Sequence, residues 1–83
     1  MKVTLKFFAS LREALGAGGP LEVPDGATVA DVRRLLQARD DVHAQALASG
    51  RALRCALNQA LCPESTVVTE GAELAFFPPV TGG

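Results

Sequence analysis

The residues best suited to chemistry lie at the C-terminus, where a stiff, uncharged segment leads into two glycines. No charged side chain follows Glu73, so the terminal carboxylate of Gly83 is the only charge in the last ten residues. Chain ends usually carry solvated polar residues, which makes aromatic rings and prolines unusual here. The segment reads Phe76-Phe77-Pro78-Pro79-Val80-Thr81-Gly82-Gly83.

These residue types suit activation of the terminal carboxylate by a partner enzyme. A carboxylate is a poor electrophile, and it is typically activated as an acyl-adenylate made from ATP. Gly82 and Gly83 have no side chain to clash and tolerate unusual backbone angles, so they can thread a narrow slot. Pro78 and Pro79 stiffen the base of the tail, which reduces the entropy lost on insertion. At about 3.3–3.6 Å per extended residue, residues 78–83 can reach on the order of 20 Å.

The other candidate reactive side chains favour structural roles. His43 is the only histidine, and we expect it to be a solvated side chain on an exposed helix. Cys55 shares its predicted strand face with Leu53 and Leu57, which indicates a small buried hydrophobe with an inert thiol. Cys62 lies near a strand end and is the alternative nucleophile. Two cysteines cannot hold a structural zinc or iron–sulfur centre, which needs about four ligands, so no metal site is expected.

Hydrophobic periodicity predicts the elements that position the tail. Lys2 to Phe7 alternates with period two, which indicates a strand with one buried face. Thr28 is a predicted N-cap, with Asp31 completing a variant of the capping box. The helix that follows has Val29, Val32, Leu35 and Leu36 on its apolar face, and Arg33, Arg34 and Gln37 on its wet face. Shorter elements are expected at residues 9–15 and 40–49 (helices) and at 21–23, 53–57, 60–62 and 73–77 (strands).

This order of elements predicts a two-layer α+β roll, in which a mixed sheet packs on one main helix. Residues 1–77 should form one domain and residues 78–83 an extended, free tail. The first and last strands are expected side by side, which would carry the C-terminus off one edge of the sheet. The predicted core consists of Val3, Leu5, Phe7, Val32, Leu35, Leu36, Leu57, Leu74 and Phe76.

Phe8 and Phe77 are predicted to form a partner-docking patch. Each lies one residue past an inward-facing phenylalanine, so each points to the opposite face of the sheet if its strand stays regular. Neighbouring first and last strands would bring the two rings together. Exposed aromatic rings are favoured interface anchors. The alternative is a second small core under a loop.

Composition and charge exclude several classes of protein. The 83 residues suit a single domain, and the net charge of −1 lacks the basic footprint of a nucleic-acid binder. The apolar stretches are too short to span a membrane. The start lacks the apolar region of a secretory signal, so we expect a cytoplasmic protein with reduced cysteines.

Four segments together resemble a known family, the small subunits of molybdopterin synthase. They are Phe7-Phe8-Ala9, Leu11-Arg12-Glu13, Ala56-Leu57-Asn58-Gln59 and the segment from Phe76 to Gly83. The resemblance implies a ubiquitin-like β-grasp fold related to the sulfur carrier of thiamine biosynthesis. It also implies that an E1-like enzyme uses ATP to adenylate Gly83, which a sulfur donor converts to a thiocarboxylate.

The resemblance further implies a division of labour between two subunits. The tail, Pro78 to Gly83, would insert into the large synthase subunit, in a heterotetramer. There its sulfur would pass to cyclic pyranopterin monophosphate and form the dithiolene of molybdopterin. The large subunit would supply the catalytic residues, so this chain would be a carrier that binds no cofactor itself rather than an enzyme.

The sequence departs from the family's pattern in two respects, and two alternative functions stay open. Ala72 stands where an acid often precedes the last strand of the family, and Cys55 and Cys62 match no family role. The carrier could serve another biosynthetic product, or its glycyl end could be transferred to a lysine as a protein modifier. A plain β-grasp interaction module with an incidental Gly-Gly is the remaining alternative.

Overall fold

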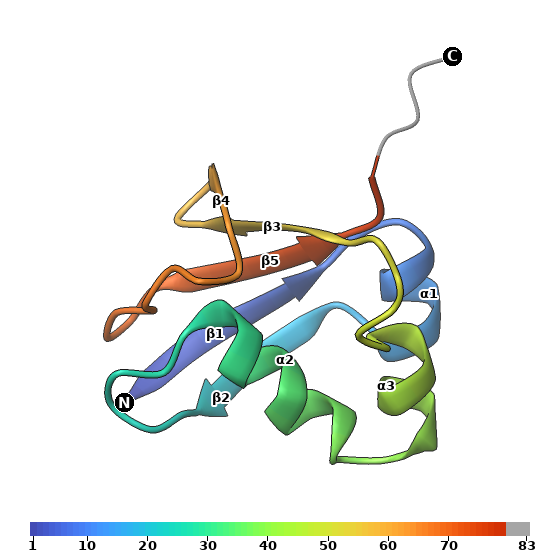
Figure 1. Cartoon of the computed structure of the whole chain (residues 1–83), viewed down its shortest axis with the longest axis horizontal. Helices are drawn as coiled ribbons and strands as arrows, with labels where there is room; N and C mark the ends of the chain where they lie inside the picture. The colour runs from blue at the N-terminus through green and yellow to red at the C-terminus, as the bar shows by residue number, and fades with distance from the viewer. Residues whose placement is uncertain (80–83) are drawn as a thin grey trace.

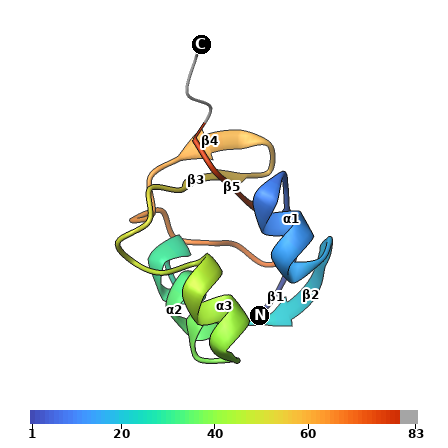
Figure 2. The same cartoon turned by 90° about the vertical axis from the view of Figure 1, so that its right-hand side faces the viewer.

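A five-stranded mixed sheet organises the chain, with strand order β2-β1-β5-β3-β4. The computed structural model describes residues 1–79. The central pair, β1 and β5, is parallel, and every other pairing is antiparallel. Helix α2 packs against one face of the sheet, with α3 beside it (Figures 1 and 2). The elements are β1 (Lys2–Phe7), α1 (Ser10–Leu15), β2 (Gly18–Glu22), α2 (Val29–Gln37), α3 (Asp41–Ala46), β3 (Arg54–Leu57), β4 (Ala60–Cys62) and β5 (Glu73–Phe77).

The two central strands supply the middle of the core. In β1 every second residue is buried, as the alternation predicts. Phe7 of β1 lies opposite Phe76 of β5, and their ring centroids are 6.3 Å apart in a stacked arrangement. The predicted two-layer roll and the pairing of the first and last strands are therefore confirmed.

Helix α2 begins as predicted, and three of the four residues of its predicted apolar face, Val29, Val32 and Leu36, are buried. The capping box is present, because Thr28 Oγ1 accepts from the Asp31 amide and the Asp31 carboxylate accepts from the Thr28 amide. The prediction that Leu35 is a core residue is wrong, since it is 44% exposed. At 3.6 residues per turn, Leu35 lies about 100° from Leu36 around the helix axis, on the side of the buried residues away from Arg33. The prediction that Arg33 is on the wet face is also wrong, since it is 5% exposed.

Strand β2 starts three residues earlier than the sequence predicted. Gly18 and Gly19, which look like a turn, pair with Lys6 and Leu5 of β1. A Cβ atom at Gly18 would lie 2.2 Å from the carbonyl oxygen of Leu5, and φ at Gly18 is +106°. Only glycine allows this close approach. Pro20 fits the same strand because β2 is at the sheet edge, where its missing N–H costs no ladder bond.

The remaining elements follow the predictions with small shifts. Helix α3 ends at Ala46, short of the predicted Ser49, and β3 starts at Arg54. The predicted turn between β3 and β4 is confirmed, with φ of 51° at Asn58 and 68° at Gln59. No helix within residues 1–79 has the length and hydropathy needed to cross a membrane. The core also includes large residues outside the predicted list, among them Leu11, Val23, Leu47 and Val68, whereas Leu57 is only half-buried.

Candidate functional site

The tail leaves the sheet from the end of its central strand, not from one edge as expected (Figure 1). Strand β5 is flanked on both sides, because Phe76 lies opposite Phe7 of β1 and Phe77 lies opposite Arg54 of β3. Pro78, half-buried, and Pro79, exposed, follow directly. Neither proline can donate a ladder hydrogen bond, which explains why the strand ends here.

Four of the residues predicted to react or to insert into a partner lie outside the described residues. They are Val80, Thr81, Gly82 and Gly83. The boundary between domain and tail at residue 77 also stays a prediction. The described residues do include the surface around the base of the segment.

Two aromatic rings meet beside the tail base. The centroids of Phe8 and Phe77 are 6.5 Å apart with planes at 81°, a T-shaped pair. The Phe8 amide donates to the Phe76 carbonyl at 3.3 Å, which extends the β1–β5 pairing by one residue. Phe8 is 44% exposed, and Phe77 is half-buried. The predicted proximity is confirmed, and the docking role stays a prediction.

The rings belong to a wider apolar strip that the sequence analysis missed. On the face of β5 that carries Phe77, the next residue is Ala75, which lies opposite Ala56 of β3. Ala56 in turn lies opposite Leu61 of β4, and Leu61 is 65% exposed. We call Phe8, Phe77, Ala75, Ala56 and Leu61 the apolar strip. Its two alanines are buried, and its accessible members are Phe8, Phe77 and Leu61. The hairpin register, once Asn58-Gln59 is taken as its turn, would have placed Leu61 on this face.

Charged side chains flank the apolar strip. Arg54 lies directly opposite Phe77 at the tail base and is exposed. Lys6 lies opposite Ala75, and its Nζ is 3.5 Å from a carboxylate oxygen of Glu73. The surface around the tail base is thus apolar at its centre with polar and charged residues around it, the usual anatomy of a protein interface.

His43 does not join this surface, and it is not the solvated side chain that was expected. Its side chain is only 12% exposed, with Nδ1 2.7 Å from Oδ1 of Asp40. Asp40 caps helix α3 by accepting from the His43 amide at 2.8 Å. These two hydrogen bonds hold the pKa of Asp40 below its ordinary value, the backbone bond contributing most. His43 therefore supports the start of α3.

The two cysteines face each other across the β3–β4 hairpin. Cys55 is buried, as predicted, and its Sγ lies 3.9 Å from Sγ of Cys62. Burial, followed by the neighbouring Cys62 thiol, raises the pKa of Cys55 to about 12. Because the thiolate is the nucleophilic form, Cys55 is a poor nucleophile at neutral pH. Within residues 1–79, no three His, Cys, Asp or Glu side chains gather as a metal site.

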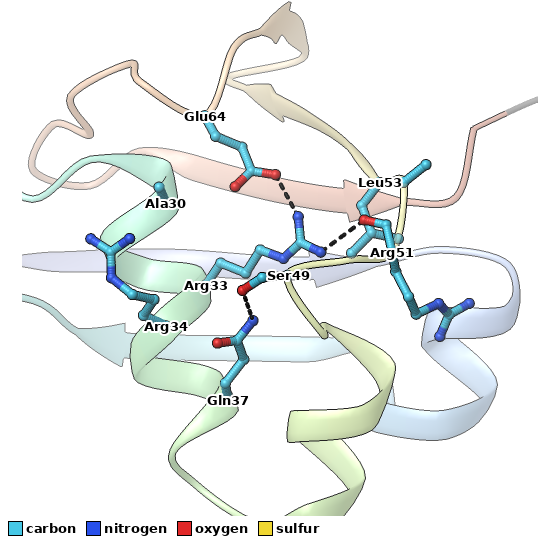
Figure 3. A pocket seen from close by; sticks show the side chains of 9 residues that line it. Ala30, Arg33, Arg34, Gln37, Ser49, Arg51, Leu53 and Glu64 are labelled. Atoms are coloured by element: carbon cyan, nitrogen blue, oxygen red, sulfur yellow. Dashed lines mark hydrogen bonds and ion pairs between the residues drawn. The ribbon is translucent and has the colours of Figure 1, made fainter.

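A polar cavity of about 250 Å³ lies beside α2, lined by Arg33, Gln37 and Glu64 among others (Figure 3). Arg33 is committed to internal contacts. Its Nε donates to the Leu47 carbonyl at 2.8 Å, Nη1 to Glu64 at 2.6 Å, and Nη2 to the carbonyls of Ala48 and Arg51. The guanidinium therefore ties α2 to the loop before β3, which explains its burial.

Comparison with known proteins identifies the family. The model of the ThiS family matches residues 5–83. A Haemophilus influenzae molybdopterin synthase sulfur carrier subunit is 46% identical, with 93% of this chain and 94% of the relative covered. The Escherichia coli sulfur carrier subunit is 41% identical over 98% and 99%. Small archaeal modifier protein 3 of Haloferax volcanii is 34% identical over 100% of both chains.

Solved structures confirm the ubiquitin-like fold that the resemblance implies. The crystal structure of SAMP1 from Haloferax volcanii superposes with a TM-score of 0.77 at 29% identity, covering 100% of both chains. A chain from the complex of subunits 1 and 2 of molybdopterin-converting factor from Helicobacter pylori gives 0.67 at 23% identity, also over 100% of both. With its β-grasp roll, and with relatives named as sulfur carrier subunits over nearly their full length, this chain belongs to the ThiS family.

Proposed function

We propose that this chain is the sulfur carrier subunit of a molybdopterin synthase and carries sulfur as a thiocarboxylate on Gly83. The observation that carries this proposal is the identity of 46% and 41%, over nearly the whole chain, to two proteins with that name. The sequence of the tail supports it, because two glycines and a terminal carboxylate suit entry into a narrow active site.

The chemistry proceeds in two displacements at the chain end. A carboxylate oxygen of Gly83 attacks the α-phosphorus of ATP, and pyrophosphate leaves. A donor that supplies sulfur at the oxidation level of sulfide then attacks the acyl carbon, and AMP leaves, so the product is a thiocarboxylate. An E1-like activating enzyme provides the ATP site, and this chain holds no cofactor. The thiocarboxylate then gives its sulfur to cyclic pyranopterin monophosphate.

The chain's own residues bind and position rather than catalyse. Among residues 1–79, His43 is paired with Asp40 and Cys55 is buried, so neither is placed to act on a substrate, and Cys62 is a half-buried free thiol. The catalytic acid–base groups are assigned to the large subunit, in a cytoplasmic heterotetramer. A solved complex of subunits 1 and 2 of molybdopterin-converting factor supports a partner of this kind.

The apolar strip is the proposed docking surface for the large subunit. It adjoins Pro78, where the tail begins, so docking there would aim the tail into the partner. Aromatic side chains supply much of the binding energy at interfaces, and Phe8 leaves 44% of its surface exposed. The partner's surface should present apolar side chains to the rings and an acidic group to Arg54.

A protein modifier is the second candidate, because small archaeal modifier protein 3 is 34% identical over the whole chain. In that function a lysine amine attacks the activated glycyl carbon, AMP leaves, and an isopeptide bond forms. The carrier function predicts a free thiocarboxylate, whereas the modifier function predicts branched peptides on other proteins. A sulfur carrier for another product, and a plain interaction module, are the remaining alternatives.

The deciding experiment measures the intact mass of the full chain after incubation with an E1-like enzyme from its own source, ATP and a sulfide donor. We expect one oxygen to be replaced by sulfur, and we expect dithiolene product once the large subunit and the pterin substrate are added. Deletion of Gly83 sets the carboxylate back by about 3.3–3.6 Å. Displacements of about 1 Å can cost about 100-fold, so this variant should dock but remain inert.

The matched control adds one alanine after Gly83, which puts a methyl group where the slot fits glycine. If this variant keeps its extra residue by mass and still delivers sulfur at the normal rate, the chain end is not the carrier, and Cys62 becomes the next candidate. Thiocarboxylate without dithiolene product would leave a carrier for another pathway. Branched Gly82-Gly83 remnants on cellular lysines would favour the modifier.

A further inference from the structure

We propose that Cys55 and Cys62 form a reversible two-electron oxidation site, which closes a cross-strand disulfide in the folded domain. The class of reagent that it takes is a small two-electron oxidant such as hydrogen peroxide. This inference is independent of the sulfur chemistry assigned to the tail, because neither cysteine is in that segment.

The hairpin register brings the two thiols together. Cys55 of β3 and Cys62 of β4 lie directly opposite each other in the antiparallel ladder. Opposed residues of such a pair have Cα atoms about 4.5–5.5 Å apart, within the span of about 4.4–6.8 Å seen in disulfides. Their Sγ atoms are already 3.9 Å apart, so bond formation needs an approach of about 2 Å to reach the S–S length.

The two thiols differ in accessibility, so one can react with the oxidant and the other can then attack the resulting sulfenic acid. Cys62 is half-buried, whereas Cys55 is 3% exposed. The pKa of Cys55 is raised to about 12, mainly by burial and also by Cys62 and Glu64, with Arg33 opposing them. Cys55 is therefore protonated and shielded at neutral pH, and Cys62 is the sulfur that reacts first.

The oxidation balances in two steps. The Cys62 sulfur attacks peroxide, the O–O bond breaks, and Cys62 becomes a sulfenic acid as one water is released. Although its high pKa makes Cys55 slow toward external reagents, its sulfur lies 3.9 Å from that of Cys62. It then attacks the Cys62 sulfur, and the sulfenic oxygen leaves with the Cys55 proton as a second water. Two thiols and one peroxide thus give one disulfide and two waters. Two equivalents of an external thiol restore both cysteines by exchange and are themselves oxidised to a disulfide.

Strand β4 can accommodate the movement. It is a three-residue edge strand that pairs only with β3. The Cys55 thiol donates to the Cys62 carbonyl at 3.1 Å in the reduced state, and this bond breaks when the sulfurs join. The disulfide would replace a weak hydrogen bond with a covalent link across the edge that carries Leu61.

The test treats the folded full-length chain with hydrogen peroxide and measures intact mass after alkylation with a maleimide. We expect a monomer that has lost two hydrogens, takes up no maleimide, and takes up two after reduction. Both cysteines lie in one tryptic peptide, because no Lys or Arg follows Arg54, so the link can be placed there. Hydrogen exchange at the β4 amides should be slower in the oxidised form.

The matched control is the double variant Leu61→Cys with Cys62→Ser. It moves the second thiol by one residue, to the opposite face of the hairpin, and leaves Cys55 in place. This variant should give disulfide-linked dimers or over-oxidation of the introduced thiol, and no internal disulfide.

Two results would overturn the proposal. One is a wild-type chain in which Cys62 proceeds to sulfinic acid while Cys55 still reacts with maleimide after unfolding. The other is an internal disulfide that forms as readily in the double variant as in the wild type, since the hairpin register would then not be its cause.

Discussion

Replacing Phe8 with serine should weaken docking to the partner while leaving the domain folded, because the ring is partly buried in the domain and partly exposed to solvent. Phe8 is 44% exposed, so a little over half of its surface is buried in the folded chain. An aromatic side chain buries about 150–250 Å² when fully covered. At about 25 cal/mol per Å², the half-buried ring contributes at most about 3.5 kcal/mol to folding. A domain of this size has a total stability of about 4–12 kcal/mol, so Phe8→Ser should remain folded.

The loss in binding should be measurable although the domain stays folded. Interface anchors cost at least about 2 kcal/mol when truncated, which is about 30-fold in Kd at about 1.4 kcal/mol per tenfold. Phe77→Ser should have a similar effect. The centroids of the two rings are 6.5 Å apart. The losses of binding free energy in the two single variants should therefore be non-additive by about 0.5–1.5 kcal/mol.

Isothermal titration of the large synthase subunit measures the affinity, and thermal melting measures the fold. The matched control is Val67→Ser, which alters another exposed apolar residue, 51% exposed, that pairs with Thr28 at the start of α2. Its binding should match the wild type. If folded Phe8→Ser also binds within about threefold of the wild type, the docking argument is refuted. If the double variant Phe8→Ser with Phe77→Ser unfolds, the rings are core residues.

Three further predictions concern stability, measured by chemical denaturation. Leu36→Ala, at 1% exposure, should cost about 2–5 kcal/mol, whereas Leu35→Ala should cost about 1 kcal/mol or less; equal losses would contradict the orientation of α2. Gly18→Ala should destabilise by more than about 2 kcal/mol, because its Cβ meets backbone at 2.2 Å, while Gly50→Ala, with nothing within 4 Å, should be nearly neutral. Arg33→Met should cost about 3–5 kcal/mol by stranding a carboxylate and loop carbonyls; a neutral result would mean that water replaces the guanidinium.

Local patterns made much of this fold predictable. The alternation in β1, the Thr28 capping box and the Asn58-Gln59 turn each depend on neighbours in sequence. The contact between Phe8 and Phe77 was predictable from two inward-facing phenylalanines and the pairing of the terminal strands. None of these predictions depends on where the long loops lie.

The features that could not be predicted depend on residues far along the chain. Arg33 is buried because carbonyls of Leu47, Ala48 and Arg51 converge on it, and no local pattern places a loop there. The buried face of α2 therefore includes Arg33, which contacts that loop, and Leu35 is exposed to solvent. Gly18 gives no hydrophobic signal, so the start of β2 is determined by its close approach to β1.

The parallel pairing of β1 with β5 affects when the chain can fold during its synthesis. The central seam of the sheet joins the first strand to the last, so the core remains open on one side until Phe76 is synthesised and docked against Phe7. Contacts between such distant segments slow folding and make it cooperative. A chain interrupted before Glu73 would lack its middle strand and would be exposed to proteolysis. We expect only chains translated through β5 to fold stably, so the fold itself selects against chains that stop before Glu73.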